Sequence, residues 1–230
     1  GCVVLFLEKA VSVMLLTASL LQGGMNDAMP DKDINGTFFL VNRSQMISEN
    51  YAPEVRKTNL SGMSQSMRDD AATALEAMFA AAKADGIYLS TVSGYRSYSK
   101  QNTIYNRKVA SAGTTVADTL VALPGSSEHQ LGLAMDIAKS GSSNLNSRFA
   151  DTAEGQWVDA NAYLYGFIVR YPEGMEDITG YSYEPWHIRY VGVEYAKAIY
   201  DSGLPMDLYV SSHRAAIYSY LVQQTNEVLP

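Results

Sequence analysis

The sequence predicts an α+β fold, with a small and mostly antiparallel sheet flanked by helices. Short segments in which apolar residues occupy every second position indicate strands, and segments with apolar residues every three or four positions indicate helices. Their order along the chain is typical of one small sheet with helices packed on it. The chain has 230 residues, of which 47% are hydrophobic and 18% charged, so it can bury a substantial core.

The first predicted elements follow a linker. Residues 22–36 are rich in Gly, Asp and Asn, which favour turns and loops. The next segment, TFFLVNR at 37–43, predicts a short strand. A helix is expected over 67–84, with two aspartates in its first turn and Gly86 at its end. Its apolar residues recur at helical spacing: Met67, Ala71, Leu75, Met78 and Ala82.

The remaining elements follow from the same two patterns. The stretch QLGLAMDIA alternates leucine, methionine and isoleucine with small residues and one aspartate, which predicts a strand. The proline in EPWHIRYVG excludes a helix interior, so that stretch also favours a strand. We expect strands at 87–95, 130–138, 166–171 and 184–192, and helices at 97–110, 152–165, 193–202 and 206–224.

The N-terminal 21 residues carry no charge apart from Glu8 and Lys9. The uncharged run from Ala10 to Leu21 is shorter than the roughly 20 residues that span a bilayer, and it suits the core of an export signal or a buried helix. Two interpretations stay open. The segment is a helix packed on the domain or on a neighbouring chain, or it is a juxtamembrane part of an anchor that keeps the protein near a membrane.

Charge and cysteine content exclude several functions. The formal net charge is −7 and no basic cluster is present, so no nucleic-acid partner is expected. Cys2 is the single cysteine, which excludes an internal disulfide and a cysteine-based zinc site. A metal site would therefore depend on carboxylates and on the three histidines, His129, His187 and His213.

The stretch GSSEHQLGLAMD contains two candidate metal ligands. In the predicted strand, Asp136 shares a face with Gly132, Ala134 and Ala138, and a carboxylate buried there is costly unless it is paired or ligated. His129 lies just before the strand and could point to the same space. On this stretch alone, the simpler interpretation is favoured, in which Asp136 caps a loop and His129 is a surface residue.

A second stretch, EPWHIRY, supplies a third ligand and a base. His187 would complete a set of two histidines and one carboxylate, which suits zinc and leaves a fourth position for water. Glu184 lies three residues earlier and is a candidate general base for that water, the role of the glutamate in H-E-x-x-H metalloproteases. His213, in an amphipathic segment, is expected at the surface.

Four stretches in order resemble one known family. SGYRSYSKQ, PGSSEHQLGLAMDI, GFIVRYP and ITGYSYEPWHIRYVG are similar to VanY-type D-alanyl-D-alanine carboxypeptidases and to the related LdcB-type L,D-carboxypeptidases, zinc peptidases that trim peptidoglycan stems. The resemblance covers about residues 38–209. It implies a zinc site in a cleft with His129, Asp136 and His187 as ligands, and Glu184 as the catalytic base.

The resemblance also implies how substrate is held. Arg96 matches the arginine that receives the terminal carboxylate of the substrate and acts with the base in catalysis, and Ser127 and Gln101 match positions that help hold the peptide. The domain organisation that follows is an N-terminal helix and linker at 1–36, a zinc carboxypeptidase domain at 37–209 and a C-terminal helical tail at 210–230.

The expected function is removal of the C-terminal D-Ala from peptidoglycan stem peptides or their precursors, in the bacterial cell envelope outside the cytoplasm. D-Ala-D-Ala ends are favoured slightly on overall resemblance. Three alternatives stay open: L,D-carboxypeptidase activity on tetrapeptide stems, a zinc endopeptidase that cuts cross-links, and a non-catalytic wall-binding module. An intact Glu184 argues against the last of these.

Overall fold

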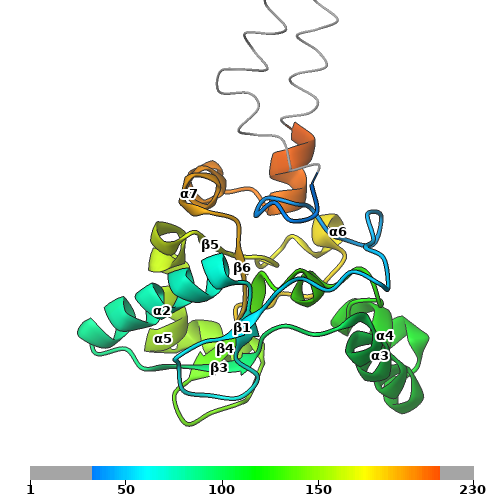
Figure 1. Ribbon diagram of the computed structural model, residues 1–230, viewed down its shortest axis with the longest axis horizontal. Coiled ribbons are helices and arrows are strands. Elements are labelled where there is room, and N and C mark those ends of the chain that lie inside the picture. Colours follow the sequence, from blue (N-terminus) through cyan, green and yellow to red (C-terminus); the bar gives the residue numbers. More distant parts are fainter. Residues whose placement is uncertain (1–32, 213–230) are drawn as a thin grey trace, which may run out of the picture. The chain divides into compact units, whose positions relative to one another are not determined.

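The computed structural model describes residues 33–212 (Figure 1). One compact unit, Asp31–Pro205, contains the central sheet. The sheet is antiparallel throughout, in the order β3-β4-β6-β5, which confirms the predicted fold class. Its strands are β3 (Leu89–Ser93), β4 (Ala134–Lys139), β5 (Phe167–Val169) and β6 (His187–Tyr190).

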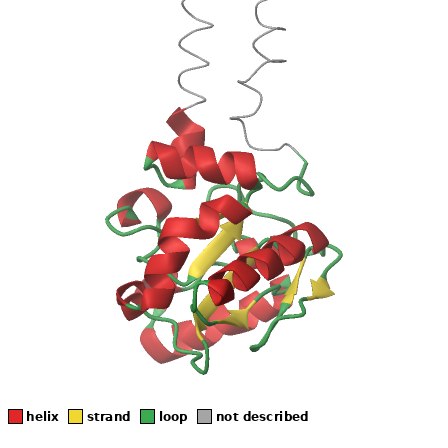
Figure 2. Cartoon of the chain, turned by 90° about the vertical axis from the view of Figure 1, so that its left-hand side faces the viewer, coloured by secondary structure: helices red, strands yellow, loops and turns green. Residues whose placement is uncertain are grey.

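Helices surround the strands (Figure 2). Helices α2 and α5 pack beside the sheet, whereas α3 and α4 contact each other at one end of the unit (Figure 1). The described helices are α2 (Asp69–Ala84), α3 (Tyr98–Ala112), α4 (Thr114–Leu120), α5 (Ala153–Asn161), α6 (Glu176–Thr179) and α7 (Val193–Ser202). The sequence analysis predicted α2, α3, α5 and α7 near these bounds and did not predict α4 or α6.

Several short elements complete the unit. A two-stranded antiparallel sheet pairs β1 (Arg56–Lys57) with β2 (Ser66–Met67), and no pattern in the sequence predicted it. Three short 3-10 helices occur at η2 (Glu128–Leu131), η3 (Ser147–Asp151) and η4 (Ala162–Tyr165). The last of these forms the final turn of the helix predicted over 152–165.

The predicted strand at 130–138 begins later than expected. Its first residues form η2, and Gly132 then turns the chain with φ of +70°, a conformation that favours glycine. A Cβ at this position would lie 3.1 Å from Val55 and 3.3 Å from the backbone nitrogen of Arg68, so the turn is also tightly packed. The strand proper starts at Ala134, and the turn directs η2 toward the end of the sheet.

The prediction of a strand at 37–43 is wrong. These residues are irregular, and side-chain donors replace a neighbouring strand. The Arg189 guanidinium donates to the carbonyl oxygens of Thr37 at 2.9 Å and Phe39 at 2.7 Å. Phe38, between them, is completely buried. The apolar residues that suggested a strand therefore anchor an irregular segment to the domain.

Some predictions fall outside the described residues. These are the N-terminal helix, most of the linker at 22–36, the part of the C-terminal helix beyond 212, and His213. Residues 206–212 are helical and belong to a second unit that begins at Met206 in this part of the chain. The domain boundaries stay a prediction. Within residues 33–212, no helix combines the length and apolarity needed to cross a membrane.

Replacing Leu75 by alanine should lower the free energy of unfolding by about 2–5 kcal/mol, because this side chain of α2 is completely buried in the hydrophobic core. Urea denaturation monitored by circular dichroism measures the change. Ala77→Ser, on the exposed face of the same helix, is the control and should change the value by about 0.5 kcal/mol or less. Equal losses in both variants would show that α2 is not packed as described.

Candidate metal centre and active-site cleft

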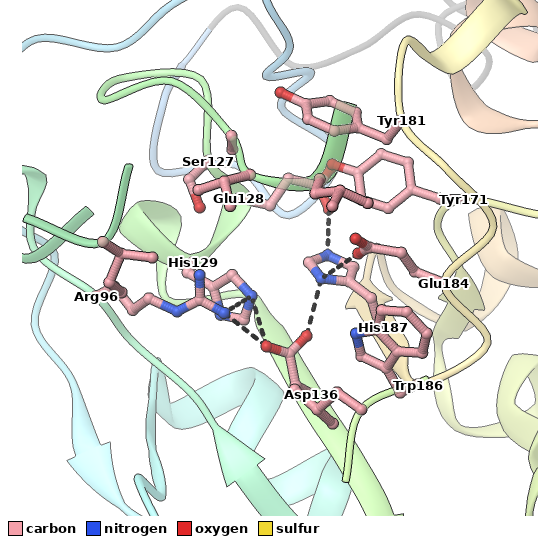
Figure 3. Close-up of a pocket in the computed structure, with 15 residues that line it drawn as sticks. Arg96, Ser127, Glu128, His129, Asp136, Tyr171, Tyr181, Glu184, Trp186 and His187 are labelled. Carbon is pink, nitrogen blue, oxygen red and sulfur yellow. Dashed lines mark hydrogen bonds and ion pairs between the residues drawn. The ribbon is translucent and has the colours of Figure 1, made fainter. Parts of the chain in front are cut away.

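Three buried side chains meet at the end of the sheet. His129, Asp136 and His187 each offer one ligand atom, and these atoms lie within 4.8 Å of one another (Figure 3). Asp136 on β4 and His187 on β6 are direct partners in the antiparallel register. His129 comes from η2, immediately before β4. The structure thus brings the three predicted ligands together by strand pairing and by one tight turn.

Asp136 lies between the two histidines. One carboxylate oxygen, Oδ1, is 3.0 Å from Nδ1 of His187, and the other, Oδ2, is 3.3 Å from Nε2 of His129. Burial would raise the pKa of Asp136, but His129 and the guanidinium of Arg96 hold it well below its usual range. The aspartate is therefore ionised at neutral pH.

The orientation of the His129 ring follows from its outer contact. Nδ1 lies 2.8 Å from the carbonyl oxygen of Gly94, which can only accept, so Nδ1 donates and Nε2 keeps its lone pair. Burial, assisted by the charge of Arg96, lowers the pKa of His129 to about 4. The ring is neutral at pH 7, which is the form that binds metals.

The lone pairs of His129 Nε2 and Asp136 Oδ2 point into the same small volume. Two such acceptors 3.3 Å apart repel each other unless positive charge lies beside them. Arg96 supplies it, since Nη2 is 2.8 Å from Nε2 of His129 and 2.6 Å from Oδ2 of Asp136. The polar groups are therefore arranged for a cation.

His187 is surrounded by carboxylates. Nδ1 faces Asp136, and Nε2 lies 3.3 Å from Oε2 of Glu128. Burial disfavours the charged ring, but the hydrogen bonds to Asp136 and Glu128 outweigh it and raise the pKa of His187 to about 9. The surroundings of His187 therefore also favour a positive charge.

Glu184 lies beside the cluster. A turn fixes it, because its backbone N–H donates to the carbonyl of Tyr171 at 3.0 Å and its own carbonyl accepts from the backbone N–H of His187 at 3.1 Å. Its Oε2 is 3.8 Å from Nδ1 of His187. Burial raises the pKa of Glu184 to about 7, which suits a group that accepts and returns a proton near neutral pH.

Arg96 forms another wall of the same site. Nε donates to the Ser93 hydroxyl at 2.8 Å and Nη1 to Oε1 of Gln101 at 3.1 Å, and these contacts aim Nη2 at Asp136 and His129. The family resemblance implies that this guanidinium binds a carboxylate of the substrate. In the structure its carboxylate partner is Asp136, so Arg96 is in direct contact with two of the candidate metal ligands.

The two other predicted substrate residues differ in position. Ser127 is buried and lines the cleft. Gln101 is completely buried behind it, where its amide donates to the carbonyl of Ala122 at 2.8 Å and accepts from Arg96. Gln101 therefore holds Arg96 in place and is not among the residues that face the cleft.

A cleft of about 230 Å³ opens onto these groups. The polar groups described above line part of it, and apolar and aromatic residues also line it. These are Ile104, Leu120, Val121, Leu145, Tyr171, Tyr181 and Trp186. Tyr171 and Tyr181 were not identified from the sequence, although both lie in the stretches that carried the resemblance.

A buried ionic cluster behind His187 was also missed. Oε1 of Glu128 accepts from Nε of Arg170 and from Nη1 of Arg189, both at 2.7 Å. All three side chains are at most 1% exposed. A signal was present in the sequence, because the apolar strand segments FIVRY and HIRYV each contain one arginine, and a charge in a buried strand requires a partner.

Two imidazoles and one carboxylate converge on a cleft, with a second, protonatable carboxyl group beside them, and this arrangement is typical of metal-dependent hydrolases. The family model described as VanY, D-alanyl-D-alanine carboxypeptidase, matches residues 64–193. The chain belongs to the VanY D-alanyl-D-alanine carboxypeptidase family.

Relatives of known sequence agree with this assignment. The chain is 54% identical over 144 residues to the protein YodJ of Bacillus subtilis, a match that covers 62% of this chain and 53% of YodJ. It is 39% identical over 189 residues to a D-alanyl-D-alanine carboxypeptidase of Enterococcus faecalis, covering 77% of this chain and 67% of that protein. The matched region thus spans about half the length of YodJ.

Solved structures share the fold. The LdcB LD-carboxypeptidase aligns with a TM-score of 0.75 and 44% identity, covering 78% of this chain and 88% of that one. A mutant of the vancomycin-resistance D,D-pentapeptidase VanY in complex with Zn(II) aligns with a TM-score of 0.66 and 39% identity, covering 76% and 98%. VanYB has also been solved in complex with D-alanine-D-alanine.

Proposed function

We propose that the protein is a zinc-dependent carboxypeptidase that removes the C-terminal D-Ala from peptidoglycan stem peptides, with D-Ala-D-Ala ends favoured. The observation that carries this proposal is the convergence of His129, Asp136 and His187 beside Glu184 at the base of one cleft. Membership of the VanY family, and the VanY structures with Zn(II) and with D-alanine-D-alanine, support it.

The donor set fits zinc. Nε2 of His129, one carboxylate oxygen of Asp136 and Nδ1 of His187 would be the ligands, and sites with three such protein ligands are typical of catalytic zinc. Zinc bound there would supply Lewis-acid activation of water and of the scissile carbonyl.

Glu184 is the proposed general base and acid. Its carboxylate accepts a proton from the attacking water as the water oxygen adds to the carbonyl carbon. It then returns the proton to the amine nitrogen as the C–N bond breaks, which releases the terminal amino acid. A pKa of about 7 permits both transfers near neutral pH.

Arg96 is the proposed anchor for the free end of the substrate. It lines the cleft next to the cluster, and a guanidinium binds a carboxylate through two parallel hydrogen bonds. Ser93 and Gln101 fix its orientation. Only a peptide with a free terminal carboxylate would then place its last bond at the reacting groups. Ser127, at the cleft wall, is proposed to contact the peptide.

One observation favours a second candidate, L,D-carboxypeptidase activity on tetrapeptide stems. The LdcB structure aligns with higher TM-score and identity than the VanY structure does. The zinc-loaded protein should be incubated with tetrapeptide and pentapeptide stems, and the products identified by mass. Loss of one D-Ala from the pentapeptide supports the D,D assignment, and loss from the tetrapeptide alone supports the L,D assignment.

The proposed substrate determines where the protein acts, and the positions of the site residues indicate which part of the chain is required. Peptidoglycan lies in the cell envelope, so we infer an extracytoplasmic location. We also infer that 37–209 forms the catalytic domain, between flanking segments at 1–36 and 210–230. All the residues of the proposed mechanism lie between Arg96 and His187.

His187→Ala should lose most of the bound zinc, because it removes one of three proposed ligands. The wild type should hold one zinc per chain, measured by metal analysis after dialysis. Alanine in place of His213, which the sequence predicts to lie at the surface and outside the site, is the control and should keep full occupancy. Wild-type zinc content in the His187 variant would refute the ligand assignment.

Glu184→Gln should keep the fold and the zinc but lower kcat by several orders of magnitude. General acid–base catalysis contributes about 10²–10⁴-fold, and the amide can neither accept nor return the proton. Release of D-Ala and zinc content are measured on the same sample. Turnover within tenfold of the wild type would remove Glu184 from the mechanism.

Arg96→Ala should weaken cleavage of a free-acid substrate by roughly 30-fold to several thousand-fold, the effect of losing about 2–5 kcal/mol from a buried charge pair. The wild type should strongly prefer the acid over the C-terminal amide, and the variant should discriminate less. Zinc content must be checked, because Arg96 also contacts Asp136. Equal cleavage of acid and amide by the wild type would instead favour an endopeptidase.

A further inference from the structure

Glu128 is a buried carboxylate outside the proposed ligand set that contacts one of the ligands. Its Oε2 lies 3.3 Å from Nε2 of His187, on the side of the ring opposite Asp136 (Figure 3). Its Oε1 accepts from Arg170 and Arg189, both at 2.7 Å. The mechanism proposed above gives this residue no role in proton transfer or substrate binding.

We propose that Glu128 is a positioning residue that fixes the His187 ring so that Nδ1 presents its lone pair to the metal. This inference rests on the proposed zinc site. An ionised carboxylate can only accept, so Nε2 of His187 must carry the hydrogen of their contact. Without metal, Nδ1 also carries a hydrogen, because it faces the carboxylate of Asp136. Zinc would displace the hydrogen on Nδ1, the nitrogen beside another proposed ligand, while Glu128 would retain the one on Nε2.

The two arginines make Glu128 suited to this task. Both guanidinium groups donate to the same oxygen, Oε1, so the carboxylate cannot rotate without losing both contacts. Because Oε1 is occupied by these two donors, Oε2 is the oxygen left to accept from His187. Because all three groups are at most 1% exposed, water does not compete for these bonds.

The two histidines are oriented by different acceptors. His129 donates its outer N–H to the neutral carbonyl of Gly94, whereas His187 donates to a charged carboxylate. A carboxylate partner increases the basicity of a metal-binding imidazole, and loss of such a partner typically lowers metal affinity about 10–100-fold. His187 is therefore the ligand whose electron donation depends on a neighbouring side chain.

Glu128→Gln tests the inference with nearly unchanged shape. The amide oxygen would stay with Arg170 and Arg189, which can only donate, and the NH₂ group would then face Nε2 of His187. Two donors cannot share this contact unless Nε2 gives up its hydrogen, which moves the hydrogen to Nδ1. We expect zinc affinity to fall about 10–100-fold in competition titrations with a chelating dye.

A control variant tests the loss of a glutamate–arginine pair elsewhere in the domain. Glu76→Gln weakens the partly exposed pair between Glu76 of α2 and Arg56 of β1, away from the cluster, and should leave zinc affinity unchanged. Glu128→Asp keeps the charge on a shorter side chain and should restore part of the affinity. Unchanged affinity in Glu128→Gln would overturn the role of Glu128 while leaving the zinc site intact.

The Glu128→Gln variant can fold less well, because the two buried guanidinium groups would face a neutral amide. A measurement on the wild type avoids this dependence on folding. In zinc-loaded protein labelled with ¹⁵N-histidine, NMR should show His187 with hydrogen on Nε2 and metal on Nδ1, assigned by comparison with His187→Ala. Zinc on Nε2 would overturn the inference. Failure of the wild type to take up zinc would overturn the proposed site and this role together.

Discussion

The pairing of Asp136 with His187 across β4 and β6 is the constraint on which the site depends. The two residues are 51 positions apart in sequence but are direct partners in the strand register. A shift of one residue in that register would move one of them to the opposite face of the sheet. The central strand pair therefore defines both the core and the position of two metal-binding side chains.

Burial of so many charged groups is possible because their signs alternate. Glu128 and Asp136 each contact a cation or a hydrogen-bond donor on two sides, from the interior of the domain to the wall of the cleft. An isolated charge in such surroundings would be costly, and removal of one member of a buried pair typically destabilises a protein by about 3–5 kcal/mol. In order, the groups are Arg189 with Arg170, Glu128, His187, Asp136 and Arg96.

Sequence patterns predicted most of the fold and the central residues of the site. Helical spacing located α2 and α7, and ionisable residues within otherwise apolar strand segments indicated Asp136 and His187. The irregular segment at 37–43 was misread because its carbonyl groups bond to a side chain distant in sequence, which no local pattern reveals. The roles of Glu128 and Gln101 depend on contacts with residues far apart or on the exact direction of a side chain, so spacing alone could not assign them.

Arg189 links two parts of the protein that are otherwise separate in sequence. One end of its guanidinium contacts Glu128 behind the metal centre, and the other holds the backbone at Thr37 and Phe39. A shortened or fused version of this enzyme that begins after Phe39 would leave those donors without acceptors in the interior. A shortened version that keeps these contacts must therefore begin at or before Thr37, even though none of the described residues 33–39 lines the cleft.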